Sequence, residues 1–201
     1  MNILAVADEE VRCFYDCYTP GILDEFDLIL ACGDLRAKYL EFLVTMARCP
    51  LLYVRGNHDD RFSKSPPEGC ICIENQIYEY RGIRILGLGG AYRYSDGDNM
   101  YTEKEMKRRI QKMKRQLRRH KGFDILLTHA PAYQIHDLEH ISHRGFQCFV
   151  DLMEAYEPRY FIHGHVHRNY GHEIPQVSGY KNTTVINASG YCRIDFPMTG
   201  S

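Results

Sequence analysis

The sequence predicts an α/β protein in which two packed β-sheets are covered by helices. Short apolar runs, bounded by Gly, Asp or Pro, recur along the chain and are typical of buried strands. Helical patterns separate the early strands, whereas residues 71–88 and 172–196 are typical of strand meanders without helices. Two sheets packed face to face accommodate both kinds of connection, so these observations together indicate the fold class.

Seven strands are expected along the chain. They cover Ile3–Ala7, Leu28–Ala31, Leu51–Val54, Ile83–Leu88, Ile125–Thr128, Tyr160–His163 and Thr184–Ala188. Each run is short and rich in leucine or β-branched residues, and turn residues bound it, which favours a buried strand.

Three helices are expected between these strands. Ala37–Ala47 and Gly145–Tyr156 carry helical patterns, and Pro158 ends the second of them. In the third, Thr102–His120, apolar residues recur at i, i+4, i+7 and i+11 and form one stripe: Met106, Ile110, Met113 and Leu117.

The third helix has capping residues and is strongly basic. Thr102 and Glu105 fit a capping box at its start, and Gly122 fits a stop after its end. Residues 102–121 hold ten Lys or Arg and two Glu, which leaves 15 basic and 24 acidic residues in the rest of the chain. Such side chains can solvate an outward face, or they can bind nucleic acid or another polyanion. Both interpretations stay open.

The composition is that of an ordinary globular protein. The 201 residues are 44% hydrophobic and 25% charged, and no linker or repeat divides them. No apolar run approaches the roughly 20 residues that span a bilayer. The apolar start lacks the preceding positive charges of a signal peptide. We therefore expect a single domain over residues 1–201, in the cytoplasm and without membrane association; the oligomeric state is left open.

Metal-competent side chains directly follow five of the predicted strands. In chain order, these are Asp8, Gly33-Asp34, Gly56-Asn57-His58-Asp59, His129 and Gly164-His165-Val166-His167. Eight of the ten histidines also lie between residues 129 and 172. Because carboxyl ends of strands in α/β sheets converge at one edge, these side chains can form a nitrogen and oxygen cage for transition metals.

This ordered set of motifs resembles the calcineurin-like metallophosphoesterase superfamily, and the small bacterial phosphodiesterase-like members are most similar in length and layout. The motifs span residues 8 to 167, so the resemblance covers essentially the whole chain. It implies a four-layer α/β/β/α fold of two mixed sheets flanked by helices.

The resemblance implies a centre of two divalent ions, with Mn²⁺ expected first and Fe, Zn, Ni or Mg as alternatives. The implied ligands are Asp8 and His167 for the first ion, Asn57, His129 and His165 for the second, and Asp34 as the bridge. Two such ions polarise a phosphoryl oxygen and make a bridging hydroxide available near neutral pH. The bridge must be anionic to hold two positive charges together, which suits Asp34.

The resemblance also implies two residues for the chemistry. His58 would protonate the leaving oxygen or stabilise charge on the phosphoryl group, since its imidazole titrates near physiological pH. Asp59 would orient the His58 ring by accepting its other N–H.

One position departs from the family pattern. The first motif of the family is usually Asp-x-His, and here Asp8-Glu9-Glu10 places Glu10 where a metal-binding imidazole is usual. Since carboxylates also bind these metals, we expect Glu10 to be a ligand of the first ion, with a salt bridge or outer-shell role as the alternative. As a ligand, Glu10 would add negative charge that repels a dianionic monoester more than a monoanionic diester.

Several residues near the motifs are candidates for substrate contact. Arginines that follow motif residues can meet a phosphate bidentately, although surface charge is the more common use of such residues. The candidates are Arg36, Arg93, His143 and Arg168. For His143 and its neighbours His136 and His140, a solvated loop or polar packing is the alternative.

The expected function is metal-dependent hydrolysis of a small phosphoester, with a phosphodiester favoured. A non-catalytic scaffold of the same fold is one alternative, but a scaffold would be expected to lose the residue at the position of His58. A nuclease or nucleic-acid-binding protein that uses the helix at 102–121 is the other. Metal-dependent hydrolysis would distinguish the hydrolase from the scaffold. Salt-dependent binding of oligonucleotides would test the nucleic-acid alternative.

Overall fold

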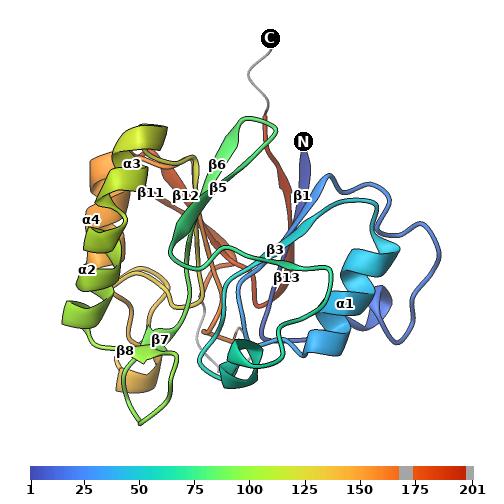
Figure 1. Cartoon of the computed structure of the whole chain (residues 1–201), viewed down its shortest axis with the longest axis horizontal. Coiled ribbons are helices and arrows are strands. Elements are labelled where there is room, and N and C mark those ends of the chain that lie inside the picture. The colour runs from blue at the N-terminus through green and yellow to red at the C-terminus, as the bar shows by residue number, and fades with distance from the viewer. Residues whose placement is uncertain (168–173, 198–201) are drawn as a thin grey trace.

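Two mixed β-sheets lie face to face in the computed structural model, which describes residues 1–167 and 174–197. Helix α1 (Ala37–Met46) covers the outer face of the first sheet. The helices that cover the second sheet are α2 (Glu103–Lys112), α3 (Lys114–His120) and α4 (Gln147–Tyr156) (Figure 1). The fold class expected from the sequence is confirmed: the layers follow one another as helix, sheet, sheet, helix.

The first sheet has five strands, in the order β13-β1-β2-β3-β4. Their bounds are β1 (Asn2–Ala7), β2 (Leu28–Ala31), β3 (Leu51–Tyr53), β4 (Ile71–Cys72) and β13 (Gly190–Asp195). Strands β1 to β4 run parallel, whereas β13 is antiparallel to β1, with Asn2 opposite Asp195. Strands from the two ends of the described chain therefore lie side by side.

The second sheet has six strands, in the order β11-β12-β10-β9-β6-β5. Their bounds are β5 (Gln76–Tyr80), β6 (Ile83–Leu88), β9 (Ile125–Thr128), β10 (Tyr160–His163), β11 (Val177–Tyr180) and β12 (Thr183–Asn187). The four inner strands are parallel, and an antiparallel hairpin closes each edge.

Smaller elements lie in the loops that follow the strands. Strands β7 (Ala91–Tyr92) and β8 (Met100–Tyr101) form a short parallel pair. The 3₁₀ turns are η1 (Arg12–Phe14), η2 (Asp60–Ser63) and η3 (Ile141–His143). Within the described ranges, none of the helices has the length and apolarity needed to cross a membrane.

The core has three apolar layers, one for each interface between the layers of the fold. Between the two sheets, residues such as Leu30, Ile85 and Leu127 are fully buried. Tyr39 and Leu43 of α1 pack on the first sheet, and the helices of the second sheet contribute the other outer layer. Burial of apolar area on both faces of each sheet stabilises the strands, so the loops at their carboxyl ends are held in fixed positions.

The two expected meanders are each divided between the sheets. In the first, β4 extends the first sheet, while β5 and β6 form an edge hairpin of the second. In the second, β11 and β12 form a hairpin of the second sheet, and β13 crosses to β1. Sequence periodicity reports local strand character, but the partner of a strand depends on contacts between distant residues. His172 lies outside the described residues.

The basic segment is two helices, where the sequence predicted one. The capping box of Thr102 and Glu105 is present at the start of α2, as expected. Met113 leaves the ideal helical backbone, with φ −88° and ψ −1°, and separates α2 from α3. Met113 still packs in the core, so the apolar stripe is maintained across the break. Lys121 adopts a left-handed conformation with φ 55° and precedes Gly122, where the helix was expected to stop.

Candidate metal centre

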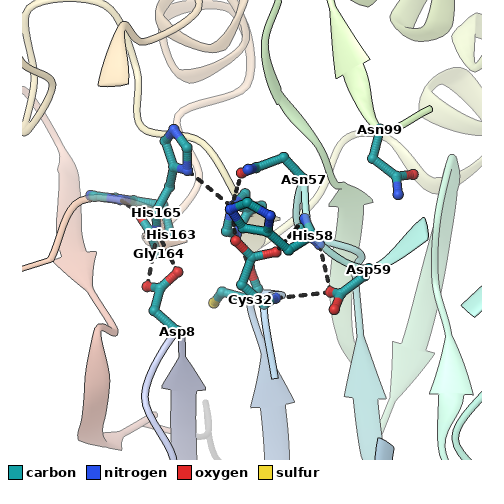
Figure 2. A network of polar contacts seen from close by, with 12 residues as sticks. Asp8, Cys32, Asn57, His58, Asp59, Asn99, His163, Gly164 and His165 are labelled. Atoms are coloured by element: carbon teal, nitrogen blue, oxygen red, sulfur yellow. Dashed lines mark hydrogen bonds and ion pairs between the residues drawn. The ribbon is translucent and has the colours of Figure 1, made fainter. Parts of the chain in front are cut away.

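The loops that follow five parallel strands meet between the two sheets. Asp8 follows β1, Asp34 follows β2, and Asn57 follows β3 in the first sheet; His129 and His165 follow β9 and β10 in the second. Figure 2 shows Asp8, Asn57 and His165 reaching into one region from these separate elements. The structure therefore brings together side chains that lie up to 157 residues apart along the chain.

Four donor atoms converge on one point in this region. The Nε2 atom of His129 lies 2.9 Å from Oδ1 of Asn57, 3.1 Å from Nδ1 of His165 and 3.4 Å from Oδ2 of Asp34. Ligand atoms of Asp34, His129 and His165 all lie within 4.8 Å of one another. His129 and Asn57 are 0% and 3% exposed, so water does not compete for these atoms.

The hydrogen bonds on the far sides of the rings fix their tautomers. Nδ1 of His129 lies 2.7 Å from the carbonyl oxygen of Cys32, and Nε2 of His165 lies 2.5 Å from that of Ser142. A carbonyl oxygen can only accept, so both of these nitrogens carry hydrogen, and the lone pairs of the other two point inward. When His129 is neutral, two imidazole nitrogens, an amide oxygen and a carboxylate face one another without a donor, and either a proton on Nε2 of His129 or a cation satisfies them.

The electrostatics of the pair His129 and Asp34 agree with this geometry. Burial lowers the pKa of His129, but the carboxylates of Asp34 and Asp8 outweigh it and raise that pKa to about 9. Burial raises the pKa of Asp34, yet the charge of His129 and hydrogen bonds from His129 and His58 hold it well below its usual range. Burial, together with the charge of His129, lowers the pKa of His165 to about 3. A proton on His129 thus supplies the positive charge in the metal-free chain.

Asp8 and His167, the ligands expected for the first ion, lie near Asp34. The carboxylate of Asp8 accepts hydrogen bonds from the main-chain N–H of His165 at 2.9 and 3.1 Å. Burial raises the pKa of Asp8 to about 6, while the charges of His129 and His167 oppose that rise. Nδ1 of His167 lies 3.3 Å from Oε1 of Glu9, and its side chain is 32% exposed. Among the described residues, only Asp34, His129 and His165 form a group of three ligands close enough for one ion, so a second ion at Asp8 and His167 stays a prediction.

The backbone of the motif loops is unusual at the ligand positions. Asp8, Asp34 and His165 have positive φ angles of 61°, 55° and 70°. This region is costly for residues with a Cβ and is found where surrounding structure enforces it. Gly56 allows the loops to approach, because a Cβ at that position would lie 2.0 Å from Oδ1 of Asp34.

His58 and Asp59 follow the same strand but face different surroundings. His58 is exposed, and its main-chain N–H donates to Oδ1 of Asp34 at 2.8 Å. The carboxylate of Asp59 is buried and accepts from the main-chain N–H groups of Asp34 and Gly56, both at 2.8 Å. The structure gives Asp59 different partners from the His58 ring expected from the sequence: Asp59 ties two motif loops together and shapes the backbone around Asp34.

The carboxylate of Glu10 forms an ion pair with an arginine. Both oxygens of its carboxylate accept from Nε and the terminal nitrogen of Arg36 in a bidentate ion pair. This corresponds to the salt-bridge alternative for Glu10, whereas Glu9 is the carboxylate beside His167. Sequence reasoning missed Glu9. A run of acids after β1 was visible, but spacing alone could not show which member turns toward the centre.

The other candidates for substrate contact differ in position. Arg93 pairs with Glu105 at the start of α2, at 3.2 Å. His143 lies beside the centre, its ring centroid 5.4 Å from that of His165, and burial lowers its pKa. Arg168 lies outside the described residues.

Tyr94 and Ser142, which the sequence did not single out, support the centre, and His136 packs behind it. Tyr94 accepts a hydrogen bond from Nδ2 of Asn57 at 3.2 Å and so turns the amide oxygen inward. Ser142 accepts from His165, as described above. His136 contacts His163, the residue before Gly164, at 3.0 Å between ring nitrogens. Tyr94 lies in a loop with no motif, so no sequence signal pointed to it.

Comparison with known protein families gives one match. Residues 11–169 match the family model for calcineurin-like phosphoesterases. This segment is well over half of the chain and contains the motif residues from Asp34 to His167. No curated protein sequence matches the chain.

Solved structures share the fold at low sequence identity. A phosphopantetheinyl hydrolase from Mycobacterium tuberculosis is 14% identical, with a TM-score of 0.61 over 94% of this chain and 88% of that one. The protein TT1561 of Thermus thermophilus is 13% identical, with a TM-score of 0.58 over 94% and 89%. GAP50, the anchor in the inner membrane complex of Plasmodium, is 13% identical, with a TM-score of 0.57 over 94% and 71%. The fold is thus shared by a hydrolase and by an anchor protein.

Proposed function

The chain belongs to the calcineurin-like phosphoesterase family, and from this premise we propose that it is a metal-dependent hydrolase of a phosphodiester. The observation that carries the proposal is the convergence of Asp34, His129 and His165, with the amide oxygen of Asn57, on one buried point. Once His129 gives up its second proton, four acceptors are available to a cation, and nitrogen and oxygen ligands suit Mn²⁺, Fe, Zn or Ni.

The proposal includes a second ion on the open side of Asp34. Asp8 and His167 supply ligands there, and Asp34 is the anionic bridge between the two positions. When bound, two such ions would polarise a phosphoryl oxygen and lower the pKa of a water molecule to near neutrality. The protein contributes the fixed ligand positions, which Cys32, Tyr94 and Ser142 hold from behind.

The position of His58 supports a role as the acid for the leaving group. Its main chain is tied to Asp34, while its side chain is exposed at the edge of the centre. We propose that the ring holds a proton near the leaving oxygen, or stabilises charge on the phosphoryl group. Asp59 supports this position by fixing the backbone on both sides of the centre.

A preference for diesters follows from the number of carboxylates. Asp8 and Asp34 face the centre and Glu9 lies beside His167, so three negative charges oppose those of two divalent ions. These carboxylates lower the net positive charge, which weakens the attraction of a dianionic monoester more than that of a monoanionic diester. Glu9 supplies the third negative charge that the sequence assigned to Glu10, because Arg36 neutralises Glu10.

Nucleic-acid binding by α2 and α3 stays a prediction. Their outward face is rich in exposed Lys and Arg, but Arg109 is committed to a buried ion pair with Glu74. Oligonucleotide binding that weakens steeply with salt would support it. A scaffold role is less favoured, because His58 is present beside the ligand group of Asp34, His129 and His165.

The test is hydrolysis by the metal-free protein after addition of single metals. Monoesters, diesters and cyclic nucleotides are compared with Mn²⁺, Fe²⁺, Zn²⁺, Ni²⁺ and Mg²⁺. We expect diester hydrolysis that a chelator abolishes and that Asp34→Asn lacks, since the anionic bridge is gone. A full rate from the Asp34→Asn variant, or no hydrolysis with any metal, would refute the proposal.

A further inference from the structure

We propose that the cavity beside His58 binds a negatively charged group on the leaving side of the substrate, with Lys38 and Arg61 as the residues that select it. The inference rests on the proposed function and adds the substrate class. The substrate is a phosphodiester whose leaving alcohol carries a second anionic group, such as a phosphate or a carboxylate.

The cavity opens directly from the candidate centre. It has a volume of about 490 Å³ and lies between the first turn of α1 and the 3₁₀ turn η2. Asp34 and His58 form the end that adjoins the centre, and Arg36, Lys38, Arg61 and Phe62 line the remainder. If His58 protonates the leaving oxygen, the leaving group departs on the side of His58. This cavity is the space on that side.

The charges in the cavity favour an anion. Lys38 and Arg61 are exposed, and in the described part of the chain neither side chain has an ion pair or hydrogen bond. The two acids of the lining are already used: Asp34 faces the candidate centre, and the carboxylate of Asp59 is buried against main-chain N–H groups. Two cations without acidic partners therefore face a space of molecular size.

Two further features fit an occupant with a defined shape. Phe62 packs edge-on against Tyr53, with centroids 5.8 Å apart, so one wall is a held aromatic surface. Arg36 is fixed on the opposite side by its bidentate pair with Glu10. Glu10 thus neutralises Arg36 and holds it at the cavity wall. The selection of charge is left to Lys38 and Arg61.

The first experiment measures binding without catalysis. The metal-free full chain, labelled with ¹⁵N, is titrated with glycerol 3-phosphate, and glycerol is the uncharged control. We expect amide shifts at residues 36–38 and 58–65 with the phosphate only. The double variant Lys38→Gln, Arg61→Gln should bind at least about tenfold more weakly, as expected for the loss of two exposed charge contacts. Lys64→Gln is the matched control, because Lys64 lies in the same turn but does not line the cavity.

The second experiment uses two methyl phosphodiesters of nitrophenol, one with a carboxylate on the leaving ring and one without. We expect the ratio of kcat/KM, charged over uncharged, to fall about tenfold in the double variant and to stay unchanged in Lys64→Gln. A ratio that is equal in all three proteins, or phosphate shifts outside the cavity, would overturn the proposal. If neither diester is hydrolysed, the proposed function fails, and the titration alone decides whether the anion site exists.

Discussion

The two halves of the candidate metal centre differ in how far their side chains are buried and held by hydrogen bonds. In the half formed by Asn57, His129 and His165, the side chains are 3%, 0% and 7% exposed, and each is held from behind by a hydrogen bond. In the half formed by Asp8 and His167, the side chain of His167 is 32% exposed and contacts a glutamate that is itself 45% exposed. Asp34 is common to both.

The difference indicates a division of labour. A buried set of ligands with fixed rotamers loses little conformational entropy on binding, so it should hold its ion tightly. A set that includes a partly exposed histidine should hold its ion more weakly and leave room for substrate oxygens. We therefore expect the buried half to fill first and the open half to fill at higher metal concentration.

Replacing one histidine from each half gives the largest expected effect. His129→Asn should lose the tightly held ion and at least about 10⁴ of the rate, since charge stabilisation of several kcal/mol disappears with the ion. His167→Asn should keep one ion per chain after gel filtration and recover part of its rate at high Mn²⁺. Metal content by mass spectrometry and kcat measure both. Equal metal losses in the two variants would show that the halves do not differ.

A substitution at His58 separates chemistry from metal binding. His58→Ala should lower kcat by about 10²–10⁴, the range typical of general acid catalysis, while both halves keep their ions. The loss should be greater for an alkoxide leaving group than for nitrophenolate, because only the poor leaving group needs the proton. If both leaving groups lose the same factor, His58 acts by charge stabilisation alone.

The pH dependence of metal affinity sharpens the description of the buried half. The pKa of His129 is raised to about 9, so between pH 7 and 9 an entering cation must displace a proton from it. Affinity should rise about tenfold per pH unit over this range and level off above it. Competition with a chelator of known pH dependence measures the slope. A flat profile in the unmodified protein would contradict the assignment.

The two glutamates after Asp8 give the smallest expected effect. Glu9→Gln should weaken the ion of the open half about tenfold, because Glu9 contacts His167 and sets its ring. Glu10→Gln should change metal affinity less than about twofold, since its carboxylate is paired with Arg36, whose side chain is 74% exposed. Metal titrations of the matched pair decide between them. A larger loss in Glu10→Gln would restore Glu10 as the ligand that the first motif suggests.

Much of the fold could be predicted because apolar runs and the turn residues that bound them identify the strands from local sequence. The bounds of β2, β6, β9 and β10 agree with those expected from apolar runs and turn residues. What could not be predicted is the sheet to which a strand belongs, as β4 and β13 show. Their assignments depend on pairing with strands far away in the sequence, and no local pattern contains that information.

In the site, too, local sequence identified some features and missed those that depend on tertiary contacts. Strand ends and motif order identified the residues that converge, including Asp34, His129 and His165. The choice of Glu9 over Glu10 and the partners of Asp59 depend on a left-handed turn at Asp8 and on the close approach of two loops. Positive φ at an aspartate is energetically unfavourable, so local propensity predicts against it.

The pairing of β1 with β13 has a consequence for biosynthesis. Strand β1 is synthesised before its outer neighbour β13, which ends at Asp195. At typical translation rates, roughly 10–40 s separate the two. Throughout that interval one edge of a fully apolar strand, Ile3–Ala7, has no partner in the sheet, which makes the nascent chain prone to aggregation. Asp8 directly follows that strand, so the sheet that positions it is completed only after β13 has been synthesised.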